Sequence, residues 1–371
     1  MFSAALARFF RKLMRNRKGR FLFVGVVILT AILTISTIGF WFFEREKNLS
    51  FFDSLWLSYV TMSTVGYGDL YPTTTGGRVL SLLVTMTGGI GIVAYIATFL
   101  ATTFIEWDNK RTKGLAPVNV SDHFLIINCP NQEKVRTIVE EIRLDKQMKD
   151  VPIVLISDDL EECPEQFQEI EDFYFVRGNP LLIRVLERAN APKATRAIIL
   201  ARDTKDANSD GITTQIALTL EGLHRTHGSN IYSVAEAVSK DSVGPLNAAG
   251  VEDVICLETI ISPILAQAML NPGVAEVTEA LTSQQKGDQF YVSAIDHLQE
   301  RRYEEIRELF QARDDIRIIP IAIFRDGRPI INPEGPTLIE RGDKLLYISP
   351  ERENLRARLS VTDEGVIWKK G

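Results

Sequence analysis

The stretch Thr64-Val65-Gly66-Tyr67-Gly68-Asp69 determines how the rest of this 371-residue chain is interpreted. Two glycines alternate with larger residues in it, and glycine readily adopts backbone conformations that other residues avoid. A strained, extended segment of this composition can aim successive backbone carbonyls in the same direction. Carbonyl oxygens are the ligands that a dehydrated alkali cation needs. The stretch therefore indicates a cation-coordinating loop, and a plain glycine-rich turn is the alternative.

Long apolar segments lie on both sides of this loop. Residues 21–43 and 79–105 contain no charged side chain, and each is long enough to cross the hydrocarbon core of a bilayer. Trp41, Phe42 and Phe43 end the first segment, as is typical of the aromatic belt at a membrane interface. The sequence therefore predicts two membrane-spanning helices, and this context favours the cation-coordinating loop over the turn.

The segment before the loop is too short and too polar to cross the membrane. Residues 50–63 are interpreted as a re-entrant helix with Ser50 as its N-cap and Asp53 in its first turn. The C-terminal end of such a helix would direct partial negative charge toward a cation at the membrane centre. Glu44-Arg45-Glu46-Lys47, which follows the first spanning segment, marks a short external turret.

The charge distribution predicts the topology. The whole chain has a net charge of −6, yet residues 1–20 contain seven Lys or Arg and no acid. The positive-inside rule places such a segment in the cytoplasm, either along the membrane surface or as a solvated tail. Two crossings then place both termini on the cytoplasmic side of the cell (plasma) membrane. Residues 21–105 form a membrane module, and residues 106–120 are short and polar, which is typical of a linker.

The remaining sequence has the alternating pattern that is typical of a soluble α/β protein. Strand-like apolar runs alternate with amphipathic helical segments throughout residues 121–257, which predicts a doubly wound parallel sheet. Residues 258–275 are interpreted as a crossover helix. Residues 276–371 form a smaller α+β unit, in which Asp326-Gly327 is a hairpin turn.

Residues 64–69 resemble the selectivity filter of potassium channels at every position. Residues 121–371 resemble a regulator-of-potassium-conductance (RCK) domain. The specific points of that resemblance are His123, Gly178-Asn179-Pro180, Ala248-Ala249-Gly250-Val251 and Arg341-Gly342-Asp343-Lys344-Leu345. The expected fold is an α-helical pore module of two transmembrane helices and a pore helix, followed by a Rossmann-like RCK domain with a small α+β C-terminal lobe. The implied function is a potassium-selective channel that is gated by ligand binding to the RCK domain.

The resemblance assigns roles to the loop residues. Thr64 would supply its carbonyl and its hydroxyl to K⁺, Val65, Gly66 and Tyr67 would supply carbonyls, and Gly68 would permit the turn at the outer mouth. One copy of the loop cannot surround an ion, so the sequence requires a symmetric oligomer, and the resemblance implies a homotetramer.

Residues outside the loop are also assigned by the resemblance. Trp56 matches the pore-helix tryptophan that holds the filter aspartate, here Asp69, and Val60 replaces a glutamate that pairs with that aspartate in some relatives. Gly88 matches the gating-hinge glycine of two-helix channels. We expect Gly89 and Gly91 to serve close helix packing instead.

The nucleotide-binding signature of a doubly wound sheet is missing. A dinucleotide site needs G-x-G-x-x-G after the first strand, whereas this chain has Asn128-Cys129-Pro130-Asn131-Gln132-Glu133. Asp158 follows the second strand, where a ribose-binding acid belongs, but it lacks the phosphate loop. These residues argue against NAD binding in the usual manner and leave open a mononucleotide that is held differently.

A regulatory divalent cation is the second candidate ligand. Calcium-gated relatives use three acids at positions that read Ala201, Glu236 and Val238 here, so only Glu236 is retained as a metal-ligand candidate. One carboxylate cannot supply the six to eight oxygen ligands that Ca²⁺ prefers. Other acids near the strand ends, Asp203, Asp206 and Asp210, leave a different site open.

The sequence also argues against other classes of protein. An ion-conducting subunit of a potassium uptake transporter is the alternative, but such proteins resemble four joined repeats with degenerate filters. A membrane-anchored dehydrogenase would need a glycine fingerprint and a catalytic constellation, and the sequence has neither, so no enzyme is expected. The basic leader indicates membrane topology and not nucleic-acid binding.

The three cysteines fit no zinc pattern or disulfide framework. Either four RCK domains suffice for gating, or additional RCK domains complete a gating ring.

Overall fold

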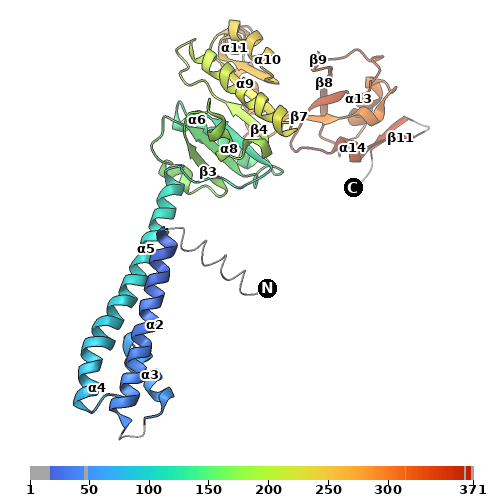
Figure 1. Cartoon of the computed structure of the whole chain (residues 1–371). Helices are drawn as coiled ribbons and strands as arrows, with labels where there is room; N and C mark the ends of the chain where they lie inside the picture. Colours follow the sequence, from blue (N-terminus) through green and yellow to red (C-terminus); the bar gives the residue numbers. More distant parts are fainter. Residues whose placement is uncertain (1–16, 46–48, 314, 363–364, 369–371) are drawn as a thin grey trace. The chain divides into compact units, whose positions relative to one another are not determined.

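The computed structural model describes residues 17–45, 49–313, 315–362 and 365–368 (Figure 1). The chain divides into two compact units, residues 1–111 and residues 112–371. Most of the basic segment predicted at residues 1–20, and residues 46 and 47 of the predicted turret, lie outside the described residues. Each unit is described by itself below.

The membrane unit is helical throughout. It contains α2 (Arg17–Phe43), α3 (Phe51–Met62), α4 (Thr75–Leu80), the π-helical segment η2 (Ser81–Ile90) and α5 (Gly91–Thr112). Two helical stretches, Phe23–Phe43 and Thr75–Thr112, are long and apolar enough to cross a membrane. The short helix α3 begins as the sequence predicts, because the Ser50 hydroxyl accepts the amide N–H of Asp53 and the Asp53 carboxylate accepts that of Ser50.

The second spanning helix is irregular in its middle. In η2 the hydroxyl of Thr87 donates to the carbonyl of Leu82, five residues earlier, at 2.7 Å. This spacing matches the wider π-helical turn. The buried hydroxyl of Thr85 donates to that of Ser36 in α2 at 2.9 Å, which joins the two spanning helices by a polar contact. Such contacts help to associate helices in lipid, where apolar surfaces alone give little preference.

The helix also continues further than the sequence predicts. The apolar run ends at Ile105, but α5 ends at Thr112, so residues 106–112 of the predicted linker are helical. Polar residues mark where the membrane ends and do not by themselves end a helix. Lys110 and Arg111 in the last turn suit the negative end of the helix dipole.

The first part of the second unit, residues 112–371, is a six-stranded parallel sheet with the order β3-β2-β1-β4-β5-β6. Its strands are β1 (His123–Ile127), β2 (Ile153–Ser157), β3 (Phe173–Arg177), β4 (Ala194–Ile199), β5 (Tyr232–Ala237) and β6 (Asp253–Cys256). The helices around it are α6 (Gln132–Leu144), α7 (Glu165–Gln168), α8 (Ile183–Arg188), α9 (Ser209–His227) and α10 (Val243–Ala248), with short 3-10 turns η3 (Ala191–Lys193) and η4 (Lys240–Ser242). The doubly wound prediction is confirmed.

Alternate side chains of the central strand enter two separate cores. Leu125 and Ile127 of β1 belong to the core that includes residues of α8, α9 and α10, whereas Phe124 and Ile126 belong to the core under α6 and α7. This burial on both faces is characteristic of a parallel sheet covered by helices. The strand order reverses between β1 and β4, so the carboxyl ends of these strands form the crevice in which such folds bind ligands.

A smaller α+β lobe follows α11 (Leu257–Leu270) and α12 (Val274–Thr282). Its antiparallel sheet has the order β7-β10-β8-β9, with β7 (Gln289–Ala294), β8 (Ile319–Arg325), β9 (Arg328–Ile331) and β10 (Lys344–Ser349). The lobe also contains η5 (Asp296–Leu298), α13 (Tyr303–Gln311), α14 (Leu355–Arg358) and the hairpin of β11 (Leu359–Thr362) and β12 (Gly365–Trp368). The predicted turn Asp326-Gly327 joins β8 to β9, and both residues have positive φ. The final hairpin was not predicted.

Candidate functional site

The loop after α3 has an alternating backbone. Thr64, Gly66 and Gly68 have φ values of 64°, 57° and 76°, whereas the intervening residues are not among the described residues with positive φ. Alternation between left- and right-handed conformations turns consecutive peptide planes so that their carbonyls face one way. Thr64 is β-branched, and such residues rarely adopt positive φ, so the loop stores backbone strain at this position.

The C-terminal end of α3 fixes the direction of these carbonyls. The carbonyl of Val60 accepts the amide N–H of Val65 at 3.1 Å and that of Gly66 at 3.3 Å. In a trans peptide the carbonyl lies opposite the N–H. The carbonyls of Thr64 and Val65 therefore point away from α3, so the loop has one face lined by oxygen atoms.

Two contacts attach the outer end of the loop to α3. The indole Nε1–H of Trp56 donates to Asp69 Oδ2 at 2.9 Å, which is the pairing that the sequence predicts. The Trp56 ring also stacks on Tyr67, with ring centroids 5.8 Å apart and an interplanar angle of 5°. The side chain of Tyr67 is nevertheless 68% exposed in a single chain. The loop is thus held from one side and open on the other.

The three glycines of the second spanning helix differ in their surroundings. A Cβ atom on Gly89 would lie 2.5 Å from Met62 Cγ, so this glycine permits close approach of α3, as expected. A Cβ atom on Gly88 would lie 3.4 Å from Ile32, an ordinary contact that leaves the hinge assignment a proposal. The packing role expected for Gly91 is wrong for a single chain, because a Cβ there would meet nothing within 4 Å.

Glu44 makes a structural contact that the sequence did not reveal. It was expected in an external turret, but it is only 1% exposed. Its carboxylate accepts the amide N–H groups of Thr73 and Thr74, each at 3.0 Å, and their hydroxyls, each at 2.7 Å. Although burial raises the pKa of Glu44, the hydrogen bonds from Thr74 and Thr73 outweigh it and lower this pKa to about 2. The carboxylate therefore joins the end of α2 to the start of α4.

The crevice of the parallel sheet lacks a phosphate loop in its structure as well as in its sequence. Asn128 has φ 72°, and its side-chain amide donates to the carbonyl of Leu200 at 2.8 Å, which joins the ends of β1 and β4. Asn131 caps α6 by accepting the amide N–H of Glu133 at 2.9 Å. The first glycine position of a dinucleotide site is thus occupied by Asn128, whose side chain is bonded within the domain.

The candidate ribose-binding acid already has a partner. Asp158 follows β2, and its Oδ1 lies 3.3 Å from the guanidinium of Arg202, which also pairs with Asp159. Arg202 follows β4, so this cluster joins the carboxyl ends of β2 and β4. A ribose hydroxyl would have to compete with Arg202 for Asp158.

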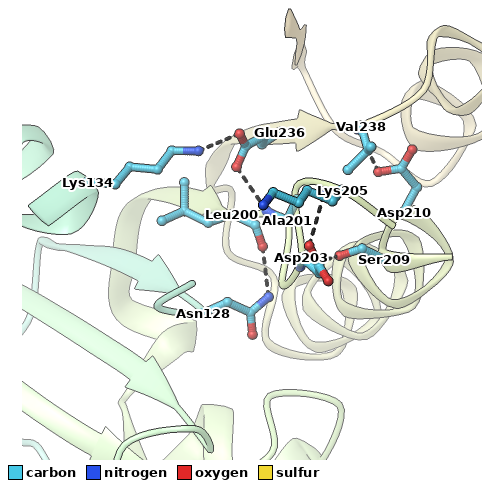
Figure 2. Close-up of polar contacts among 10 residues, drawn as sticks. All are labelled: Asn128, Lys134, Leu200, Ala201, Asp203, Lys205, Ser209, Asp210, Glu236 and Val238. Carbon is cyan, nitrogen blue, oxygen red and sulfur yellow. Dashed lines mark hydrogen bonds and ion pairs between the residues drawn. The ribbon is translucent and has the colours of Figure 1, made fainter. Parts of the chain in front are cut away.

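The candidate metal ligand Glu236 also has partners within the chain. Figure 2 shows Lys134 and Ala201 approaching the two carboxylate oxygens of Glu236, with the amide N–H of Ala201 donating to Oε2 at 3.1 Å. Of the neighbouring acids, Asp210 accepts the amide N–H groups of Val238 and Ser239, at 2.8 and 2.9 Å. Within the described ranges, no group of three or more His, Cys, Asp or Glu side chains is placed to hold a metal ion.

Cys129, Cys163 and Cys256 are buried thiols. Burial raises the pKa of the Cys129 thiol to about 11, and the charge of Asp159 adds to this effect. A thiol with a raised pKa is a poor nucleophile at neutral pH, so its place next to the crevice indicates packing.

Three family models match successive parts of the chain. Residues 27–106 match a family described as an ion channel, and residues 119–224 match the RCK domain of calcium-activated, slowpoke-like potassium channels. Residues 258–364 match a family described as Castor and Pollux, part of a voltage-gated ion channel.

Several proteins are similar to this chain over most of its length. YugO of Bacillus subtilis is 29% identical over 248 residues, which are 67% of this chain and 71% of that protein. Potassium channel protein 1 of Methanocaldococcus jannaschii is 25% identical over 92% of this chain and 97% of its own length. The calcium-gated potassium channel TvoK of Thermoplasma volcanium is 21% identical over 90% and 91%, respectively.

Solved structures with a related chain course are larger. A structure of the GsuK channel bound to NAD has a TM-score of 0.46 and 18% identity, and the match covers 90% of this chain but 58% of that one. The structure of the human SLO3 gating ring has a TM-score of 0.46 and 15% identity over 62% of this chain and 44% of that one.

The matched models fall on the pore module and on the parallel sheet in the order in which the structure has them. Two relatives that are similar over at least 90% of this chain are named as potassium channels. This sequence matches one pore module and an RCK domain in a single chain, which does not favour the transporter alternative. The chain is a potassium channel subunit of the two-helix type with a C-terminal RCK domain.

Proposed function

We propose that four copies of this chain surround one potassium pathway and that the residues Thr64 to Gly68 of each copy coordinate the dehydrated ion. The observation that carries this proposal is the alternating backbone of the loop, whose N–H groups bind the Val60 carbonyl while its carbonyls point away. Only a ring of such loops gives an ion enough oxygen ligands. In this arrangement Trp56 and Asp69 support the loop from behind, and Gly88 is the point at which the second helix bends.

The cytosolic domain sets when this pathway opens. TvoK, which is similar over most of this chain, is named as a calcium-gated channel, so a cytosolic ligand is the expected signal. We place the ligand-sensitive region at the carboxyl ends of β1, β2, β4 and β5, because Asp158 follows β2 and Glu236 lies near the end of β5. The ligand class is a nucleotide or a divalent cation, and either must compete with the internal partners of these two acids.

Further copies of the RCK domain are the partners that suit α11 and α12. α11 has no buried residue among those described, and Met269 at its end is 80% exposed. Ile260, Ile261 and Leu265 add to this apolar surface. A surface of this kind marks an interaction site, and copies of the same chain are present around a shared pore. We infer from the positive-inside rule that the basic N-terminal segment and the α/β domain both lie on the cytoplasmic side of the cell membrane.

Potassium flux into proteoliposomes tests the proposal. Purified channel should admit K⁺ and exclude Na⁺, and Gly66→Ala should abolish selective flux because a side chain at φ 57° strains the loop. Cytosolic Ca²⁺, Mg²⁺ and nucleotides, added one at a time, then identify the ligand. Selective flux that survives Gly66→Ala would refute the assignment of the loop.

A further inference from the structure

The region around Glu236 already contains a cation, which is supplied by the chain itself. We propose that the ammonium group of Lys134 is the built-in counter-cation of Glu236, in place of a diffusible divalent cation. This inference rests on the proposed gating role of the RCK domain and narrows it, because it removes Glu236 from the residues that bind a divalent ligand directly.

Burial explains why Glu236 needs a permanent partner. The residue is 7% exposed, and an isolated buried carboxylate is strongly disfavoured unless an opposite charge and hydrogen bonds compensate it. Lys134 supplies the opposite charge at Oε1, and the amide N–H of Ala201 supplies a hydrogen bond at Oε2. Both oxygens are therefore occupied by donors.

The surroundings of Glu236 do not suit Ca²⁺ or Mg²⁺. Both ions prefer several oxygen ligands, whereas the backbone group that Ala201 presents here is a donor. Asp210 uses its two oxygens to accept the amides of Val238 and Ser239, and Asp203 accepts the amide of Lys205 at 2.9 Å. These acids hold the loops that follow β4 and β5, as Figure 2 shows, and are not directed at a shared point.

The ion pair also has a mechanical consequence. Lys134 lies in the first turn of α6, directly after β1, whereas Glu236 lies near the end of β5. Their contact ties α6 to β5 across the crevice, and the bond from Asn128 to Leu200 ties β1 to β4 beside it. The pair therefore fixes the position of α6 relative to β5 at the crevice.

The first test compares wild type with Glu236→Gln as full-length channel in detergent after treatment with a chelator. Isothermal titration with Ca²⁺, and separately with Mg²⁺, should give the same number of bound cations per chain in both proteins. A binding event that wild type shows and Glu236→Gln loses would overturn the proposal. Potassium flux through the same preparations reports the pore separately, so a channel without flux would contradict the proposed function and not this inference.

The second test removes the ammonium. Lys134→Met should lower the thermal unfolding midpoint, because it leaves the buried carboxylate of Glu236 without its opposite charge. The double variant Lys134→Met/Glu236→Gln should recover part of this loss, because it carries no uncompensated charge, and Lys134→Arg should behave as wild type. Lys286→Met is the matched control, because Lys286 pairs with the exposed Glu279. A Lys134→Met protein as stable as this control, or a double variant no more stable than Lys134→Met, would contradict the proposal.

Discussion

The carbonyl of Gly114 accepts the amide N–H of Arg177, the last residue of β3, at 2.9 Å. Two residues earlier, the carbonyl of Thr112 at the end of α5 accepts the amide N–H of Cys163 at 2.8 Å. Since β3 is an edge strand of the parallel sheet, the chain that leaves the second spanning helix joins the RCK domain at this edge. Only Lys113 lies between the two residues that make these contacts.

Gly114→Ala should uncouple the domain from the pore. Gly114 has φ 61°, and a Cβ atom there would lie 2.5 Å from the amide nitrogen of Arg177. We expect a loss of about 1–3 kcal/mol of stability at this contact and a weakened response of channel opening to the cytosolic ligand. Single-channel recording of the open probability measures that response.

Gly228→Ala is the matched control for this change. Gly228 has nearly the same φ, 64°, but a Cβ atom there would meet nothing within 4 Å. The control therefore carries the backbone strain without the collision, and ligand-dependent opening should be retained. Equal losses in the two variants would show that the Gly114 contact does not transmit gating.

Trp56→Phe should destabilise the conducting state of the filter without changing which ion passes. The phenyl ring can still stack on Tyr67, but the N–H that binds Asp69 is lost. A hydrogen bond to a charged group contributes about 1.5–3 kcal/mol. In single-channel records we expect shorter openings with unchanged K⁺ over Na⁺ selectivity. Trp56→Phe and Asp69→Asn should be non-additive in a double-mutant cycle, whereas additive effects would mean that the two residues act independently.

Glu44→Gln should loosen the outer ends of the spanning helices. The amide nitrogen of glutamine cannot accept the donors of Thr73 or Thr74, so about 1–3 kcal/mol of stability should be lost. Because the pKa of Glu44 is lowered to about 2 from 4.5, its stabilising effect is complete above pH 4.5 and is lost as the pH falls toward 2. Thermal unfolding of the detergent-solubilised channel over this range measures the effect. A wild type and variant that differ equally at every pH would contradict it.

The glycines of the second spanning helix should respond in a graded way to alanine. Gly89→Ala should lower thermal stability most, because its Cβ collides with Met62. Gly91→Ala should be tolerated, since the space around it is open in a single chain. Gly88→Ala should fold normally but open less often, because alanine favours the straight helical conformation over a bent one, with a helix propensity about 1 kcal/mol better than that of glycine. Normal opening of a stable Gly88→Ala channel would show that Gly88 is not the gating hinge.

The sequence predicts the parts of this molecule whose partners are close along the chain. The capping box of Ser50 and Asp53 depends on neighbouring residues, and the pairing of Trp56 with Asp69 spans 13 positions within one helix–loop unit. The periodicity of the strands was sufficient for the parallel sheet.

Contacts between residues that are distant along the chain could not be predicted from the sequence. Glu44 looks like one acid of a polar turret, because its partners Thr73 and Thr74 come 29 and 30 positions later. Lys134 and Glu236 are separated by 102 positions, and nothing in either segment indicates the other. The end of α5 was misplaced for a different reason, since the change from apolar to polar residues marks the membrane boundary and not the end of the helix.

The reversal potential of single channels in a planar bilayer, with K⁺ on one side and Na⁺ on the other, tests the central claim most directly. If the residues Thr64 to Gly68 of four chains form the ion pathway, the potential should follow the K⁺ gradient, and Gly66→Ala should abolish selective current. A reversal potential near zero in wild type, or unchanged selectivity in Gly66→Ala, would contradict the assignment of these residues to a potassium-selective pathway.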